Sequence, residues 1–291
     1  MNSDNVIAIA SLVTALVAVI GIVVTIWKQL SQREIDNRRH LDEQFSSVAL
    51  NLSSESPSLR ASAAVSILTF LKPEYKDFHE QVFMILLASL KLESNDTIAR
   101  LLSNSFEKAI RLRLKVEDKK DKPLQLDLSH CILYQIDLSG LDLREADLAF
   151  SNLKSANLTH VDLQGARGWE ANLEKARLSQ SNLEEVRFRK ANLTEAQFHD
   201  TRLVSARLEE TDLTKVEFYK AKMQGAHLDE ANLRGARFEQ ADLNDTFFRN
   251  VKNLDDRTLK SITRAKNWKN AHFDENVIIK LEQLAASDNQ L

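Results

Sequence analysis

A large apolar residue occupies every fifth position from Leu128 to Phe248, with no insertion or deletion. Of these 25 positions, 18 are Leu and five are Phe, and only Gly168 and Met223 depart from the pattern. Two residues before each large residue lies a second column, in which 13 of 25 members are Ala. A fixed internal period outweighs local propensity in deciding the fold class, so this ladder determines how the tract folds.

A period of five residues matches neither the helical period of about 3.6 nor the strand period of two. Inward-pointing residues recur at every fifth position only if the chain turns a corner within each repeat. Several repeats then complete one coil, and successive coils stack into a solenoid with the large residues at its centre. The small residues of the second column let the backbone pass close to that centre.

Runs such as Ala156–His160 (ANLTH) and Ala191–Glu195 (ANLTE) resemble the A(D/N)LXX pattern of the pentapeptide repeat family. The resemblance covers about 125 residues. It implies a mainly β fold, a right-handed quadrilateral β-solenoid with four repeats, or 20 residues, in each of about six coils. At an inter-strand spacing of about 4.8 Å, such a solenoid would be roughly 30 Å long.

Gly168 leaves one central position without a side chain, and Trp169 follows it directly. We expect a local irregularity there, with Trp169 either covering the gap or exposed as a contact point. The Phe residues of the ladder concentrate from Phe188 onward, and their register indicates core stacking rather than a binding surface.

Residues 6–27 contain no charged side chain over 22 positions. As a helix they would be roughly 33 Å long, enough to cross a bilayer core. A signal peptide fits poorly, because the leader is not basic and no small-residue cleavage site follows. The sequence therefore predicts a single-pass transmembrane anchor in a first segment of residues 1–27.

The charged flanks of this run predict its orientation. Asp4 precedes it, whereas Lys28, Arg33, Arg38 and Arg39 follow it. The positive-inside rule then places the N-terminus outside and the bulk of the chain in the cytoplasm, at a plasma or thylakoid membrane.

Apolar residues at helical spacing predict a cytoplasmic α-helical domain over residues 28–122, with helices near 74–92 and 96–116. Paired helices of this length resemble HEAT-type repeats. The five-residue register predicts the β-solenoid over 123–250. Helical spacing then returns and predicts a C-terminal helical cap over 251–291, which covers the exposed end of the solenoid.

Two segments resemble those of cyanobacterial pentapeptide repeat proteins. Residues 265–271 (AKNWKNA) are similar to their C-terminal caps, and helical segments precede the repeats in some cyanobacterial membrane proteins. The resemblance implies a membrane-anchored, cyanobacterial-like member of the family.

Outward-facing charges in the repeat tract are mixed, with 21 acidic and 16 basic residues between positions 124 and 250. Three arginines stand 20 residues apart and should stack on one face. We predict a surface for an acidic partner or headgroup from six residues: Arg167, Trp169, Arg187, Arg189, Lys190 and Arg207. The competing interpretation is a solvated face whose charge is offset by acidic neighbours, Glu170, Glu209 and Glu210.

The sequence contains no Walker loop, GxGxxG, GxSxG or HExxH motif. Its seven histidines show no paired metal-ligand spacing. Cys131 falls in the small inward column, which indicates a buried residue rather than a nucleophile. The sequence thus predicts no enzyme, no cofactor, no metal and no nucleic-acid binding.

These patterns favour a non-enzymatic, membrane-anchored scaffold that presents a rigid repeat surface to a protein partner of unknown identity. Some family members act as duplex-DNA mimics that bind topoisomerases through a dense anionic surface. The weak, arginine-interrupted charge of this tract argues against that alternative. A regulatory subunit of a membrane transport or export system is the other alternative. The oligomeric state is open.

Overall fold

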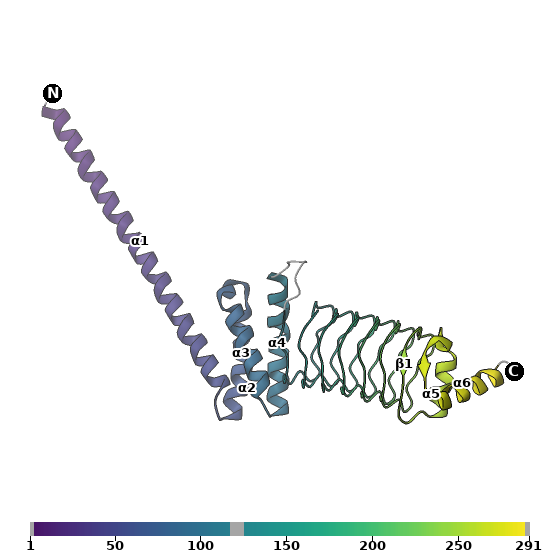
Figure 1. Cartoon of the computed structure of the whole chain (residues 1–291). Helices are drawn as coiled ribbons and strands as arrows, with labels where there is room; N and C mark the ends of the chain where they lie inside the picture. The colour runs from purple at the N-terminus through teal and green to yellow at the C-terminus, as the bar shows by residue number, and fades with distance from the viewer. Residues whose placement is uncertain (1–2, 117–124, 289–291) are drawn as a thin grey trace. The chain divides into compact units, whose positions relative to one another are not determined.

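The computed structural model describes residues 3–116 and 125–288, with the backbone alone for residues 3–20, 22, 115–116 and 288 (Figure 1). The chain divides into two units, residues 1–51 and 52–291, which we describe separately. The charged segment 117–123 lies outside the described residues.

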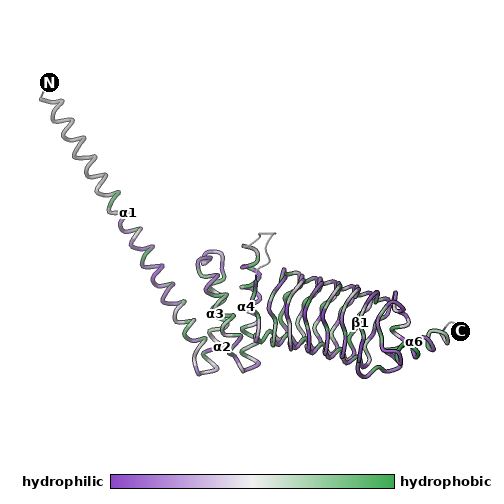
Figure 2. Tube along the Cα trace, in the orientation of Figure 1, coloured by the Kyte–Doolittle hydropathy of each residue, from purple (hydrophilic) through white to green (hydrophobic). Residues whose placement is uncertain are grey.

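The first unit is a single long helix, α1 (Ser3–Leu52), of 50 residues. The apolar run 6–27 is the beginning of this helix rather than a separate span, and the side chains of residues 6–20 and 22 lie outside the described part. After Trp27 the helix carries mostly polar and charged side chains, which Figure 2 shows as hydrophilic.

No helix in the described residues is long and apolar enough to cross a membrane. The predicted anchor at 6–27 was therefore wrong, and so was the location derived from it, with the N-terminus outside and the bulk in the cytoplasm. The described side chains of α1 include only a short apolar stretch before the polar and charged residues that follow Trp27, whereas a bilayer core requires about 20 apolar residues.

The second unit begins with a helical region. Its elements are α2 (Pro57–Ser66), the 3₁₀ helices η1 (Ile67–Leu71) and η2 (Pro73–Phe78), α3 (His79–Leu92) and α4 (Asp96–Val116). The helix expected from residue 74 starts as η2 and becomes α-helical only at His79. Helices α3 and α4 pack through fully buried aromatic rings, with the ring centroids of Phe83 and Phe106 5.2 Å apart.

From Asp127 to Lys252 the backbone forms a parallel ladder in which each bridge joins residues 20 positions apart, such as Asp127 with Asp147 and Asn152 with Asn172. Bridges recur every five residues, so each 20-residue coil has four sides. The large side chains of the five-residue register are 0% exposed and stack along the centre. The repeat tract is thus a β-solenoid, with its coils side by side in Figure 1.

Each side of a coil ends in a corner whose last residue has a left-handed backbone conformation, with φ of 59° at Glu145 and 70° at Gly140. This conformation disfavours bulky side chains and suits glycine or short polar residues. The corners therefore constrain which residues stand at the edges of the solenoid.

The ladder continues without irregularity through Gly168, contrary to our expectation. The Gly168 amide donates to the Arg187 carbonyl at 2.8 Å, as equivalent residues do in other coils. Phe188 of the next coil fills the vacant centre, because a Cβ at Gly168 would lie 2.5 Å from two Phe188 ring atoms. Trp169 is not needed to cover a gap, and it is 44% exposed.

The helical region contacts the first coil directly. The Leu90 carbonyl of α3 accepts from the Ile132 amide at 3.2 Å, and Ser103 of α4 donates to the Ile132 carbonyl at 2.9 Å. The Lys91 ammonium donates to the Asp127 carboxylate at 2.8 Å. Backbone groups at the open end of the solenoid thus find partners in the helices, as a solenoid end requires.

The other end is covered by the C-terminal segment. It contains α5 (Asp256–Thr263), η3 (Trp268–Asn270), β2 (His272–Phe273), which pairs in parallel with β1 (Phe247–Phe248), and α6 (Glu275–Asp288). Asp255 caps α5 by accepting from the Thr258 amide at 2.8 Å. The Thr258 hydroxyl then donates to the Leu233 carbonyl at 3.0 Å, and the Phe273 ring stacks on Phe248 at 4.6 Å.

Replacing Gly168 with Ala should lower the free energy of unfolding by about 1–3 kcal/mol, because the new methyl group would meet the Phe188 ring. Phe188→Leu should relieve the clash, so G168A/F188L should be more stable than the sum of the two single changes. Urea denaturation followed by circular dichroism measures all three values. Additive losses would contradict the role of Phe188 as the side chain that fills the gap.

The contact between α3 and the first coil should respond to acid. The hydrogen bond from Lys91, followed by that from Ser129, lowers the pKa of Asp127 to about 2. A carboxyl with a depressed folded pKa stabilises the fold above its unfolded pKa of about 3.9, and this contribution disappears as the pH falls toward the folded value. Because the Asp127 side chain is 65% exposed, solvent limits the effect to less than about 1 kcal/mol.

Asp127→Asn should therefore lower the free energy of unfolding above about pH 4.5 and leave it nearly unchanged near about pH 2. Urea denaturation over this range measures the difference. Lys91→Met should show a smaller pH-dependent loss, because the hydrogen bonds from Ser129 to Asp127 remain, and it should add no further pH-dependent loss to Asp127→Asn. A difference that is constant with pH would refute the assigned ion pair.

Candidate partner-binding surface

One side of the solenoid stacks its central outward side chains in a single column, in which each residue bridges the next one, 20 positions later. The column changes from acidic to basic and then to aromatic along the coils: Asp127, Asp147, Arg167, Arg187, Arg207, His227 and Phe247. The three arginines predicted to share one face are consecutive members. Their positions follow from the ladder, which places every twentieth residue at the same place in its coil.

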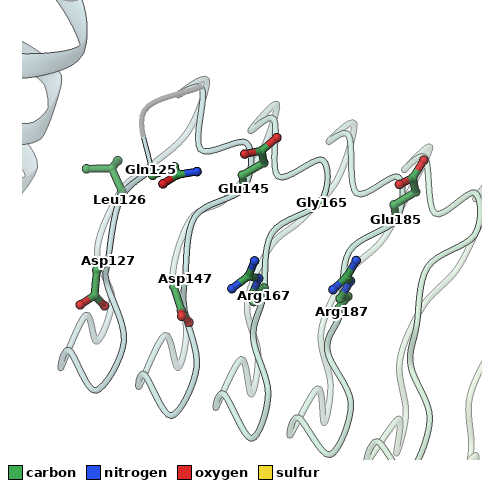
Figure 3. Close-up of a pocket in the computed structure, with 9 residues that line it drawn as sticks. All are labelled: Gln125, Leu126, Asp127, Glu145, Asp147, Gly165, Arg167, Glu185 and Arg187. Atoms are coloured by element: carbon green, nitrogen blue, oxygen red, sulfur yellow. The ribbon is translucent and has the colours of Figure 1, made fainter. Parts of the chain in front are cut away.

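A hollow of about 440 Å³ lies along this column. Asp127, Asp147, Arg167 and Arg187 line it from the side, and Glu145 and Glu185 line it from the neighbouring corner (Figure 3). Gly165 stands between those two glutamates and contributes no side chain. The hollow is thus lined by both charge signs, with the two aspartates on its first two coils and the two arginines on the next two.

Acidic neighbours neutralise three of the six predicted residues. Arg189 donates through Nε to Glu210 at 2.9 Å, and Lys190 lies 3.7 Å from the same carboxylate. The hydrogen bond from Arg189 holds the pKa of Glu210 below its ordinary value. Arg207 pairs with Glu209 at 3.0 Å. For these residues the structure agrees with the interpretation as a solvated face of paired charges.

Arg167 and Arg187 differ from the other cations of the surface. Both side chains are exposed, and neither forms an ion pair with a carboxylate among residues 3–116 and 125–288. They lie on adjacent coils, at an inter-strand spacing of about 4.8 Å, where like charges repel each other. An anionic partner placed against both would relieve this repulsion.

Trp169 belongs to the corner next to the arginine column. Its ring meets that of Phe150 edge-on, with centroids 4.9 Å apart, and Phe150 stacks on His130 at 4.8 Å. Phe150 and Trp169 are 41% and 44% exposed. Sequence reasoning missed Phe150 and His130, although the register provides a signal, because Phe150 stands at a corner position where neighbouring repeats carry polar residues or glycine.

The surface offers binding groups rather than reactive ones. Among the described residues, no three His, Cys, Asp or Glu side chains come together to hold a metal ion. Burial raises the pKa of the Cys131 thiol to about 12, so this cysteine is not an activated nucleophile. The arrangement provides two unpaired guanidinium groups beside an exposed aromatic cluster.

Known proteins share the repeat. A family model described as pentapeptide repeat region matches residues 171–248, and one described as pentapeptide repeats (8 copies) matches residues 126–159 and 151–189. No curated protein matches the chain with significance.

Several solved structures resemble this chain at low similarity. A trypsin-treated QnrB1, a plasmid-mediated fluoroquinolone resistance protein, is 18% identical, with a TM-score of 0.35 over 53% of this chain and 82% of its own. A pentapeptide repeat protein from the Arabidopsis thaliana thylakoid lumen is 24% identical, with a TM-score of 0.25 over 45% and 79%. HetL, involved in heterocyst differentiation regulation in the cyanobacterium Nostoc sp., is 24% identical, with a TM-score of 0.22 over 48% and 77%.

At this level of similarity the solved structures carry no argument about partners or activity. The family models, by contrast, match the residues that form the five-residue register and the parallel ladder. Residues 126–248 of this chain are thus pentapeptide repeats, the repeat that both family models describe.

Proposed function

We propose that this protein is a non-enzymatic scaffold whose solenoid presents a rigid surface to a protein partner. The docking surface comprises Arg167, Trp169, Arg187, Arg189, Lys190 and Arg207. The observation that carries the proposal is the pair of exposed arginines, Arg167 and Arg187, without a carboxylate partner in the described residues. Trp169 stands beside them and is 44% exposed.

Several physical features support a role in binding. Every coil is hydrogen-bonded to its neighbours, so the surface is held in one geometry and loses little conformational entropy on association. Tryptophan and arginine dominate binding energy at protein interfaces, where lysine and glutamate contribute less. Since Arg167 and Arg187 break no ion pair when they bind, their attraction to a partner's carboxylates is not offset by a lost internal contact.

The arginine column argues against a duplex-DNA mimic, because a mimic needs a continuous anionic surface. Here 16 basic residues interrupt 21 acidic ones between positions 124 and 250.

The division into a helical domain, a solenoid at 123–250 and a cap at 251–291 remains a prediction, as does a cyanobacterial-like origin.

The double variant R167E/R187E tests this function. In crosslinking and mass spectrometry from native extracts, we expect at least one protein partner whose recovery falls by about tenfold or more with the variant, because opposed charges at an interface are costly. The control is R177E/K222E, which makes the same charge change at two exposed residues on other sides of the solenoid.

Partner recovery with R177E/K222E should equal that with the unmodified protein. Identical recovery with all three proteins would refute the surface. Inhibition of gyrase supercoiling by the unmodified protein, retained in R167E/R187E, would instead support the DNA-mimic alternative.

A further inference from the structure

Phe150 occupies a position that is unusual for a large apolar residue. Every other residue with positive φ in the described part of the chain is polar, charged or glycine, whereas Phe150 has φ of 59° and is 41% exposed. A bulky side chain in this conformation is disfavoured, and its exposure gains little from the hydrophobic effect. The fold does not require Phe150, because Ser155 and Glu145 occupy the two adjacent corners of the same kind.

Trp169 is also dispensable for the core. Phe188 fills the space left by Gly168, and Ser129 holds the position equivalent to Trp169 two coils earlier. The rings of His130, Phe150 and Trp169 nevertheless form a continuous cluster over three adjacent coils, with successive centroids 4.8 and 4.9 Å apart. An exposed aromatic cluster with no structural role points to a contact with another molecule.

The aromatic cluster lies at the corner that follows the arginine column, whereas Glu145 and Glu185 lie at the corner that precedes it. Arg167 precedes Trp169 by two residues and lies on the side that ends at this corner, with Arg187 stacked on it in the next coil. An α-helix with its side chains is about 10–12 Å wide, so one helix laid along the solenoid contacts both the side and the corner. The partner must therefore carry carboxylates next to an apolar stripe.

We propose that this surface binds an acidic amphipathic α-helix that lies parallel to the solenoid axis; this proposal rests on the scaffold function above. The helix places carboxylates at positions i and i+3 against Arg167 and Arg187. Its apolar stripe packs on Phe150 and Trp169.

The spacing of the ladder favours a helix over an extended segment. Adjacent coils are about 4.8 Å apart, and three residues of a helix rise about 4.5 Å. Same-face residues of an extended strand are separated by about 6.6–6.8 Å, and a strand therefore falls out of register with the arginines. A helical partner presents the two carboxylates and the apolar stripe on one face.

The acidic start of the column also fixes the order of the charges that the helix presents along the solenoid. Asp147 lies one coil before Arg167, and its Oδ1 accepts only a local hydrogen bond, from the Ala149 amide at 2.9 Å. A basic residue at position i−3 of the helix reaches Asp147 when the carboxylates at i and i+3 reach Arg167 and Arg187. The complementary pattern is basic-x-x-acidic-x-x-acidic.

The probe is a fluorescently labelled, alanine-based helical peptide of about 20 residues with this pattern and a leucine stripe beside it. Anisotropy with the full-length protein should give a Kd on the order of 10–100 µM. The control peptide has the same composition, but its two glutamates lie on opposite faces of the helix. We expect it to bind at least about tenfold more weakly, because it cannot engage both arginines at once.

Two variants of the protein separate the contribution of the arginines to peptide binding from that of the aromatic rings. R167E/R187E and F150S/W169S should each weaken binding by at least about tenfold, because the first reverses the paired charges and the second removes the aromatic anchors. The serine changes preserve the fold, since Ser129 and Ser155 already occupy equivalent positions. R177E/K222E should change affinity by less than about twofold, because those residues lie on other sides and act only through long-range charge.

Equal affinity for the two peptides would overturn the helical register, and binding unaffected by F150S/W169S would overturn the apolar contact. Duplex DNA or phosphatidylglycerol vesicles that bind through Arg167 and Arg187, where the peptide does not, would replace the helix with a phosphate ligand. A cellular partner that needs the surface while the peptide fails to bind would refute the helix and leave the scaffold function standing. Peptide binding without any cellular partner that needs this surface would support the helix site and refute the scaffold function.

Discussion

The parallel backbone ladder between residues 20 positions apart is the interaction on which the structure of the repeat tract depends. Each coil donates to and accepts from its neighbours, so one geometry is imposed on the whole tract. The buried register of Leu and Phe stabilises the coils from inside. Because the backbone bridges and the buried large residues both recur every five residues, outward side chains can vary without disturbing the fold.

This freedom explains how a uniform core carries a non-uniform surface. The ladder stacks outward residues in columns, so the column from Asp127 to Phe247 changes from acidic to basic and then to aromatic. Within it, Arg207 is neutralised by Glu209, whereas Arg167 and Arg187 have no such partner among the described residues. Phe150 and Trp169 add an apolar edge to the same region. Binding specificity on such a scaffold depends on which outward charged side chains lack an internal ion pair.

Sequence reasoning predicted the solenoid and the helix at 96–116 because both rest on strong periodic patterns. It was wrong for residues 6–27, since no helix in the described residues is long and apolar enough to cross a membrane and the described side chains of α1 are mostly polar and charged. It also predicted an irregularity at Gly168 that is absent. The filling of that gap depends on Phe188, 20 residues away, which a reading of neighbouring residues does not reveal.

The sequence by itself determined the five-residue register, the burial of its large residues and the alignment of Arg167, Arg187 and Arg207. A fixed period places equivalent residues at the same position in every coil. Only the tertiary structure decided which of these cations are neutralised and that Phe150 joins Trp169 in one exposed cluster. Ion pairs and ring contacts depend on side-chain directions across neighbouring coils. Periodicity fixes where a residue stands in its coil, but it does not specify which neighbour its side chain meets.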